Sequence, residues 1–381
     1  MVIKMKKDYI CLLLVLGVSG LMSGCGKDFG EGTEINSHNE ESRAEEETMK
    51  EEPVNGKGSR DQNAIQITPT SEVRELETGL SIVQYEGEYG FDEFLEQGGA
   101  SSDADVATYI TSLLDQEIHM EGSPFGCSTL SVKNQTGGYL FGRNFDWNDC
   151  NGWIVSARPK NGYSSVSTVN MDFIWAGGVD LSQLPDSAQA FVSLYAPLDG
   201  MNEKGLVVSA NMIQDSPSIS QDSKKPALTT TTAVRLLLDR AADVEEGLEL
   251  LQQYDFHSSM GMMVHLAIAD ADGRSVAVEY VDHEMVVIKT PVVTNFYLAP
   301  GEKQGIGTAQ SHTRYEILTR TLEEQGEMTE TGVRDALERV SKNNFGDSQS
   351  TEWSIVMNQE TKELIYYHRE NYKRAYVVPV E

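Results

Sequence analysis

The sequence has few cysteines and few basic residues, and each shortage excludes a class of protein. It holds four cysteines in 381 residues, and their spacing matches neither a disulfide scaffold nor a zinc site. The 30 lysines and arginines are outnumbered by 59 aspartates and glutamates, which gives a formal net charge of -29. Because such a surface repels phosphate backbones, we expect no nucleic-acid partner.

Motifs that hold metal ions or phosphates are missing as well. The histidines show no HExxH spacing and no cysteine pairs accompany them, so we expect no metal ion. The chain has no glycine-rich phosphate loop, and nothing in it indicates a cofactor. Hydrophobic residues make up 39% of the chain, enough for a sizeable core in one large domain or two ordinary ones. Any chemistry must therefore come from the chain's own side chains.

The N-terminus has the pattern of a targeting signal. Three lysines among the first seven residues precede an apolar run over residues 10–18. This run is too short to span a membrane and has the length of a signal-peptide core. It is followed by Leu21-Met22-Ser23-Gly24-Cys25, which resembles the lipobox of bacterial lipoproteins. The resemblance implies that residues 1–24 are removed and that a lipid on Cys25 anchors the protein outside the cell membrane. An ordinary signal peptide is the alternative.

Two different segments are expected before residue 127. Residues 25–62 are rich in Gly, Ser, Asn and Glu, and they carry too little apolar surface to fold, so we expect an acidic linker. Residues 63–126 look like a small folded unit. Residues 80–85 are typical of a strand, and Ser102-Asp103 precedes apolar residues at helical spacing.

From residue 127 onward the pattern predicts hairpins of strands with helices inserted in blocks. This arrangement favours an α+β fold with antiparallel sheets covered by helices. The predicted strands cover residues 127–132, 139–147, 191–196, 205–211, 264–270, 275–280, 285–292, 353–357 and 364–367. The predicted helices are a pair across 228–253 and two more around 315–322 and 333–340.

The first predicted hairpin gathers three reactive groups. With its turn at residues 134–138, Cys127 faces Phe145 on the second strand, within one residue. Arg143 and Asp146 therefore come to the start of the strand that Cys127 opens. A thiol, a guanidinium and a carboxylate would converge there.

These groups suit nucleophilic catalysis by Cys127. A free thiol titrates near pH ~8.5, and a nearby cation such as Arg143 lowers its pKa. A free α-amino group titrates near ~8, so Cys127 could use its own amine as a base once the preceding peptide bond is cut. The carboxylate of Asp146 would hold that amine in place.

The same residues resemble those of a known family. Cys127 with Gly142-Arg143-Asn144-Phe145-Asp146-Trp147 is similar to the choloylglycine hydrolase (linear amide C–N hydrolase) group of N-terminal nucleophile hydrolases. Further blocks follow in the family's order, so the resemblance spans residues 127–381. They are Met201-Asn202-Glu203-Lys204-Gly205-Leu206 with Ala210-Asn211, Val293-Thr294-Asn295, Ser311-His312-Thr313-Arg314-Tyr315, and Thr351-Glu352-Trp353-Ser354.

The resemblance implies a fold and a reaction. The fold is a four-layer αββα sandwich, in which two stacked antiparallel sheets lie between layers of helices. The reaction is hydrolysis of a linear, non-peptide amide through an acyl-thioester on Cys127. The freed amino group of Cys127 would be the base, Asp146 would orient it, and Arg143 would bias the thiol toward thiolate.

The resemblance also assigns roles to three residues from later blocks. Asn211, with a backbone N–H, would form the oxyanion hole. Asn295 would position the substrate or support the amine. Arg314 would add positive potential to the pocket.

One departure concerns the residues ahead of the nucleophile. Bile salt hydrolases of this group begin almost directly at their cysteine, whereas here a long segment precedes Cys127. This arrangement resembles the branch with acid ceramidase and N-acylethanolamine amidases, in which a propeptide is cut internally. The resemblance implies autocleavage between Gly126 and Cys127. It further implies that residues 63–126 are a propeptide that stays associated with the catalytic domain, residues 127–381.

Several alternatives stay open at this point. The same scaffold could transfer the acyl group to an amine, or the chain could be a lipoprotein binding module that never matures. Cys127 and Cys150 could form one disulfide. One of His257, His265, His283 and His312 could pair with Cys127 as in papain, although no papain-type signature surrounds Cys127 and His312 is explained by its block. The chain could form a homo-oligomer. Cleavage would release the catalytic fragment from the membrane if the two pieces separated, but we expect them to stay together because the isolated propeptide would expose its apolar face.

The substrate is not specified by the sequence either. Bile-acid conjugates, N-acyl amino acids, N-acylethanolamines, acyl-homoserine lactones and penicillin V all suit relatives of this type. We expect the selecting loops near residues 148–190 and 212–226. In the first of them, Trp153, Phe173, Ile174 and Trp175 could line an apolar acyl pocket.

Overall fold

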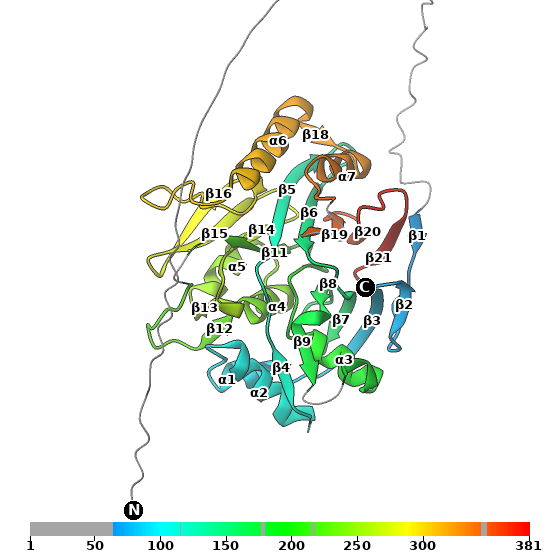
Figure 1. Ribbon diagram of the computed structural model, residues 1–381, viewed down its shortest axis with the longest axis vertical. Coiled ribbons are helices and arrows are strands. Elements are labelled where there is room, and N and C mark those ends of the chain that lie inside the picture. Colours follow the sequence, from blue (N-terminus) through cyan, green and yellow to red (C-terminus); the bar gives the residue numbers. More distant parts are fainter. Residues whose placement is uncertain (1–63, 115, 177–179, 214, 216–217, 344–348) are drawn as a thin grey trace, which may run out of the picture. The chain divides into compact units, whose positions relative to one another are not determined.

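A computed structural model of the chain describes residues 64–114, 116–176, 180–213, 215, 218–343 and 349–381 (Figure 1). The expected signal peptide 1–24, the lipidated Cys25 and the linker 25–62 lie outside the described residues. Among the described residues, no helix is long and apolar enough to cross a membrane.

The first of two large sheets contains the strand that Cys127 opens. This strand, β5, lies beside β6 near one end of an eight-stranded sheet, and β18 also pairs with β5. In order across the sheet, the strands are β1 (Ala64–Gln66), β21 (Ala375–Pro379), β20 (Glu363–His368), β19 (Ser350–Asn358), β6 (Tyr139–Trp147), β5 (Gly126–Asn134) and β17 (Val292–Val293), with β18 (Glu327–Met328) off this path.

The second sheet has nine strands and packs against the first. In order, they are β16 (Glu284–Lys289), β15 (Ser275–Val281), β14 (Met263–Ala269), β11 (Val207–Ile213), β10 (Asp199–Asn202), β8 (Ser165–Asn170), β7 (Gly152–Pro159), β3 (Leu80–Gly87) and β2 (Arg74–Glu77). Two small sheets pair β12 (Ala227–Thr229) with β13 (Asp255–His257), and β4 (Ile118–Met120) with β9 (Ile174–Ala176).

Helices cover the outer faces of both sheets (Figure 1). On the first sheet, α6 (Ala309–Gln325) and α7 (Glu330–Arg339) contact β5, β6 and β19. On the second sheet, α3 (Asp186–Ser193) contacts β3, while α4 (Thr230–Arg240) contacts β10 and β11 and packs on α5 (Val244–Leu251). Two further helices, α1 (Phe91–Glu96) and α2 (Asp103–Leu114), precede β4. The predicted αββα sandwich is therefore confirmed.

The helix that carries Arg314 has clear start and stop signals. At the N-terminus of α6, the Thr308 side chain accepts a hydrogen bond from the Ser311 N–H, which satisfies one of the free donors of the first turn. At its C-terminus, Gly326 adopts φ 69°, a conformation that favours glycine. These two ends fix the register of α6, and with it the position of Arg314 over β5.

Three details differ from the sequence-based expectation. In the two large sheets, parallel pairs occur among the antiparallel ones, namely β3 with β7, β1 with β21 and β18 with β5, and the small pair β12 with β13 is parallel too. Residues 191–196, predicted as a strand, form the end of α3 and the turn after it, because a short apolar run does not distinguish a buried helix from a strand. Residues 148–190, predicted as a loop, contain β7 and β8. Both strands are buried on both faces and so show no alternation.

Residues 64–126 contribute strands to both large sheets rather than forming a layer of their own. β3 pairs with β7 over eight residues, from Leu80 opposite Gly152 to Gly87 opposite Pro159, and β1 pairs with β21. Ile82 and Val83 are almost fully buried in the core between the layers. Removal of this segment would expose the edge of β7 and a large apolar surface.

We predict that this contact makes a large contribution to stability. The test uses a Cys127→Ala chain, which lacks the thiol that the expected cleavage after Gly126 needs. In this chain, Ile82→Ala should lower the free energy of unfolding by about 2–5 kcal/mol because it leaves a cavity. The matched control is Ile65→Ala on β1, where the side chain is 40% exposed and the loss should be about 1 kcal/mol or less. Urea unfolding measures both. Equal effects would contradict the buried packing of β3.

Candidate active site

Cys127 lies on β5 in the predicted register, directly opposite Phe145 on β6. Its backbone N–H donates a hydrogen bond to Asn295 Oδ1 at 2.8 Å, and its Sγ lies 3.7 Å from the Ala210 carbonyl oxygen. The residue is completely buried. Burial raises the pKa of the Cys127 thiol to about 11, although the Arg143 guanidinium acts in the opposite direction. Cys127 and Cys150 are both free, so the disulfide alternative is wrong.

Arg143 lies on the same face of the hairpin as the thiol, toward the second sheet. It pairs with Thr129, two residues from Cys127, and side chains two apart on a strand share a face. Its Nη1 donates to the Ala210 carbonyl oxygen and to Asn211 Oδ1, at 3.0 Å each, and also to Ser209. The guanidinium therefore holds the strand β11 against the thiol.

The partner of Arg143 is a buried carboxylate that the sequence reasoning missed. Asp199 Oδ2 lies 2.5 Å from Arg143 Nε, and neither side chain is exposed. Asp199 Oδ1 accepts a hydrogen bond from Thr168 at 2.5 Å. The sequence did offer a signal for Asp199. This carboxylate follows Leu198 and lies just before the matched Met201–Leu206 block, where burial is expected, and a buried charge requires a partner.

Asn211 has the free donor that an oxyanion hole needs. Its Oδ1 accepts hydrogen bonds from Arg143 and from Ser209 Oγ, which fixes the orientation of the amide. Its Nδ2 is buried and has no hydrogen-bond partner within the described part of the chain. A buried N–H group without an acceptor is costly unless a ligand supplies one.

Asn295 and Arg314 surround the backbone of Cys127. Asn295 Oδ1 accepts from Arg314 Nη2 at 2.7 Å, and Asn295 Nδ2 donates to the Met212 carbonyl oxygen at 2.7 Å. Arg314 Nη1 donates to the Cys127 carbonyl oxygen at 2.5 Å and to Ser128 Oγ at 2.6 Å. Arg314 thus binds the peptide backbone of the nucleophile, a more direct contact than the general positive potential expected of it.

Asp146 lies on the opposite face of the hairpin from the thiol. It pairs with Gly126 across the two strands, so its carboxylate is beside the predicted cleavage site. It accepts a hydrogen bond from Thr351 Oγ1 at 2.7 Å, and its Oδ2 lies 3.4 Å from both Arg314 and Lys342. Lys342 lies outside every matched block, and no sequence signal indicated it.

The six predicted residues therefore meet around one peptide bond, that between Gly126 and Cys127. Residues 127–296 match a family model described as "Linear amide C-N hydrolases, choloylglycine hydrolase family". The match starts at the nucleophile and ends one residue after Asn295. This segment is therefore similar to that family.

Two known proteins are similar to this chain. The chain is 27% identical over 158 residues to the penicillin V acylase of Pectobacterium atrosepticum, which covers 38% of this chain and 41% of that protein. The chain thus spans less than half the length of this curated relative. A crystal structure of a mutant conjugated bile acid hydrolase from Clostridium perfringens superposes with a TM-score of 0.50 at 18% identity. It covers 66% of this chain and 92% of that chain, which supports an N-terminal nucleophile hydrolase fold.

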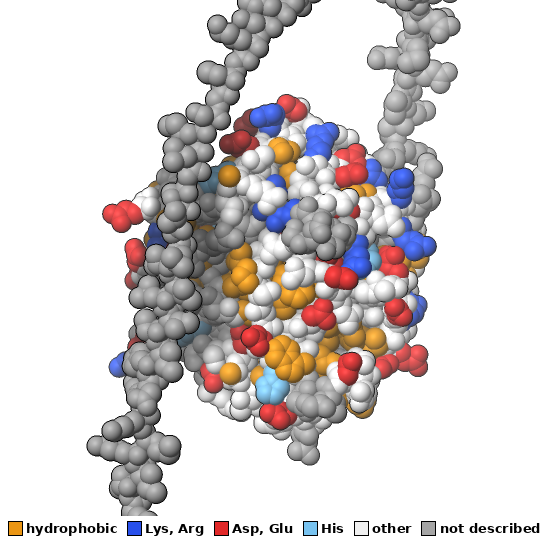
Figure 2. Space-filling view, in the orientation of Figure 1, with side chains coloured by type: hydrophobic (Ala, Val, Ile, Leu, Met, Phe, Trp, Pro, Cys, Tyr) orange, Lys and Arg blue, Asp and Glu red, His pale blue; other side chains and the backbone are white. Residues whose placement is uncertain are grey.

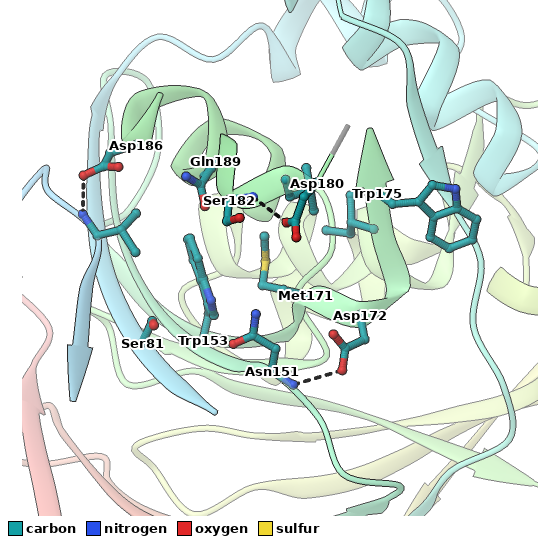
Figure 3. A pocket seen from close by; sticks show the side chains of 13 residues that line it. Ser81, Asn151, Trp153, Met171, Asp172, Trp175, Asp180, Ser182, Asp186 and Gln189 are labelled. Carbon is teal, nitrogen blue, oxygen red and sulfur yellow. Dashed lines mark hydrogen bonds between the residues drawn. The ribbon is translucent and has the colours of Figure 1, made fainter. Parts of the chain in front are cut away.

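A cavity of about 560 Å³ is lined by none of the six predicted site residues; Figure 3 shows the residues that do line it. It is lined by Trp153, Ile174 and Trp175, which the sequence suggested for an apolar acyl pocket, and by residues of β3 and α3. Asp172, Asp180 and Asp186 also line it, and Cys127 does not. The cavity therefore does not match the apolar acyl pocket expected beside the thiol. Phe173, the fourth residue of that expectation, packs on Trp147 instead, with ring centroids 5.0 Å apart.

The segment that leads to Cys127 is held along its length. The Glu121 N–H donates to the Phe173 carbonyl oxygen at 3.0 Å, and Trp147 Nε1 donates to Ser123 Oγ at 2.8 Å. Before it, β4 pairs with β9 in the lower part of the molecule, where Figure 2 shows apolar and acidic side chains at the surface. The Cys127 side chain, which follows this segment, is fully buried.

The histidines lie elsewhere. His312 Nε2 is hydrogen-bonded to the Gly305 carbonyl oxygen at 2.9 Å, and its ring stacks on Phe296. His265 pairs with Glu279 at 3.0 Å. The Cys127 thiol thus has no histidine partner among the described hydrogen bonds, in contrast to a papain-like pair.

We predict that the Cys127 thiol of the uncut chain is unreactive at neutral pH. With its pKa near 11 it is protonated at pH 7, and alkylation requires the thiolate. Labelling by iodoacetamide, followed by intact mass, should rise only as the pH approaches this pKa. The Cys127→Ala chain supplies the background from Cys150. Rapid labelling of the uncut chain at pH 7, above that background, would contradict the buried geometry.

Proposed function

We propose that this chain is a self-processing amidohydrolase that cleaves linear, non-peptide amide bonds of N-acyl substrates. The observation that supports the proposal is the hydrogen bond from the Cys127 N–H to Asn295 Oδ1, because this nitrogen is the one that cleavage would turn into an amine. A free amine at this position could serve as the base for its own thiol.

Maturation would come first. The Cys127 thiol attacks the Gly126 carbonyl carbon, and the C–N bond of the peptide breaks as its nitrogen takes up the proton of the thiol. The Gly126 thioester is then hydrolysed by water, which leaves a carboxylate on Gly126 and a free α-amine and thiol on Cys127. Arg314, bonded to the Cys127 carbonyl oxygen and to Asn295, keeps the backbone in place through these steps.

Amide hydrolysis would follow the same course with a substrate. The Cys127 amine accepts the thiol proton, the thiolate attacks the substrate carbonyl carbon, and the C–N bond breaks as the leaving amine takes that proton from the Cys127 ammonium. Water, deprotonated by the same amine, then attacks the acyl-thioester, which releases the carboxylic acid and returns the thiol to Cys127. Asn211 Nδ2 has no other hydrogen-bond acceptor in the described part of the chain, so it is free to donate to the oxyanion. One such donor is typically worth ~3 kcal/mol of transition-state stabilisation.

The relatives suggest the substrate class. One is named a penicillin V acylase and the other a conjugated bile acid hydrolase. Both names denote cleavage of an acyl group from an amine, and we extend that class to this chain as an N-acyl amide of a small molecule.

We further propose that the enzyme acts outside the cell while anchored through a lipid on Cys25. After cleavage at Gly126 the anchor and the catalytic residues belong to different fragments. The eight-residue pairing of β3 with β7 joins these fragments, so the catalytic domain would stay at the membrane with its propeptide.

Intact mass and N-terminal sequencing of the purified protein test maturation. We expect a fragment beginning Cys127-Ser128-Thr129, which co-elutes with the propeptide under native conditions. Cys127→Ala should stay uncut, whereas Cys150→Ala, the matched control, should be cut normally. A Cys127→Ala chain processed as efficiently as wild type would disprove self-cleavage. A wild-type chain that is never cut would favour a binding module.

Loss of the Asn211 donor should affect the chemical step. We expect Asn211→Ala to lower kcat by about 100-fold or more with a small change in KM, because the donor acts on the transition state. Steady-state kinetics with an N-acyl amide, after confirmed processing, measure this. An unchanged kcat would remove Asn211 from the oxyanion hole. Products that carry an added amine, formed in its presence, would indicate acyl transfer instead of hydrolysis.

A further inference from the structure

Gly126 lies in a space that has no room for a side chain. A methyl group added to its Cα would come within 2.8 Å of Asp146 Oδ2 and within 2.8 Å of Lys342 Nζ. The backbone at this position does not need glycine, because Gly126 is not among the residues with positive φ. The absence of a side chain at residue 126 is therefore a matter of space alone.

The two groups that close this space are buried and paired with each other. Asp146 is fully buried, the Lys342 side chain is 9% exposed, and Lys342 Nζ lies 3.4 Å from Asp146 Oδ2. Thr351 Oγ1 donates to Asp146 at 2.7 Å and accepts from the Lys342 N–H at 2.8 Å. The Thr351 N–H also donates to the Lys342 carbonyl oxygen at 2.9 Å. We call Asp146 and Lys342 together the α-carbon wall.

This wall resists a methyl group in two ways. Asp146 Oδ2 cannot move away easily, because Arg314 Nη1 lies 3.4 Å from it. The same Nη1 also donates to the Cys127 carbonyl oxygen, which holds Arg314 in place. Lys342 could swing away, but its ammonium would then leave a buried carboxylate, and weakening a buried ion pair is costly. Steric and electrostatic costs thus act together against a substituent.

The chemistry connects this wall to the substrate. Self-cleavage and amide hydrolysis pass through the same kind of intermediate, an acyl-thioester on Cys127 Sγ with a free amine on the same residue. In the first reaction the acyl carbon next to the carbonyl is Gly126 Cα, and in the second it is the α-carbon of the substrate. Water hydrolyses both thioesters at the same site. The α-carbon of the substrate's acyl group therefore occupies the position that Gly126 Cα occupies during self-cleavage.

We propose that Asp146 and Lys342 are specificity-determining residues that restrict the enzyme to acyl groups with an unbranched α-carbon. This inference rests on the proposed function and names its substrate class more closely. The site takes an acyl group that begins with an α-methylene, and it excludes peptides, whose acyl α-carbon carries a side chain in every residue except glycine.

The residue before Gly126 indicates the character of the acyl group beyond the methylene. Phe125 is 1% exposed and its ring lies 5.3 Å from that of Phe145, which in turn stacks on Trp353 at 4.0 Å. An acyl chain that continues along this path meets aromatic surface, so the remainder of the acyl group is apolar.

The first arm of the test uses self-cleavage, which needs no substrate. Gly126→Ala should be processed about tenfold more slowly than wild type or worse, because overpacking beside fixed groups is unfavourable. Lys342→Ala in the Gly126→Ala chain should restore part of the rate by removing one side of the wall. Gly332→Ala on α7 is the matched control, because its added methyl would be 3.5 Å from the nearest neighbour, an ordinary contact. Intact mass over time gives the rates.

The second arm uses two substrates that differ by one methyl group, the octanoyl and α-methyloctanoyl amides of aminomethylcoumarin. For wild type, the kcat/KM of the α-methyloctanoyl amide should be at least about tenfold lower than that of the octanoyl amide. In Lys342→Ala this ratio should approach one, a change that a merely structural effect on Lys342 would not produce. Both enzymes are compared only after complete processing.

The outcomes separate this inference from the proposed function. Processing of Gly126→Ala at the wild-type rate would contradict the proposed role of the α-carbon wall. A kcat/KM ratio of the two amides that Lys342→Ala leaves unchanged would contradict it as well. Self-cleavage could respond to Gly126→Ala and Lys342→Ala as expected while neither amide is hydrolysed. This result would support the steric role of Asp146 and Lys342 at Gly126 and would contradict the proposed amidase activity. A wild-type chain that never cuts itself would overturn both.

Discussion

Asn295 connects the nucleophile to both sheets, and the rest of the site depends on this connection. Its side-chain oxygen accepts from the Cys127 N–H of the first sheet and from Arg314 of α6, while its amide nitrogen donates to Met212 of the second sheet. Its own backbone N–H donates to Ser311 Oγ at 2.6 Å, at the start of α6. One amide group thereby fixes the nitrogen on which the proposed mechanism depends. The site is assembled before any bond is cut.

The buried charges are divided between the two faces of the β5–β6 hairpin. On the thiol face, Arg143 is paired with Asp199, and it orients the Asn211 amide whose N–H is free. On the other face, Asp146 lies between Arg314 and Lys342, beside Gly126. Buried ion pairs contribute little net stability compared with apolar packing, so their presence here points to function. The charges on the thiol face suit attack by the Cys127 thiol. Those on the other face suit selection of the acyl group that the thiol carries.

Much of the fold was predictable from apolar runs between turn signals and from helical spacing, even for strands such as β5 and β11 that are buried on both faces. The register that places Cys127 opposite Phe145 follows from turn position alone, because strand pairing has a period of two residues. The helices α4 to α7 were found from their apolar spacing. The strand β8 was missed because it consists mostly of Ser, Thr and Asn, which do not mark a buried strand, and β7 beside it was missed as well. Residues 191–196 were assigned to a strand because their apolar run has no period.

The sequence by itself determined which residues the proposed chemistry uses. Cys127, Arg143, Asp146, Asn211, Asn295 and Arg314 stand in ordered blocks that local spacing and family resemblance reveal together. Only the tertiary structure decided which of them touch, and it added Asp199 and Lys342, the partners of Arg143 and Asp146. These two belong to elements far away in the chain. A buried charge is satisfied by whichever opposite charge the packing of two sheets brings near, and no local pattern encodes that choice.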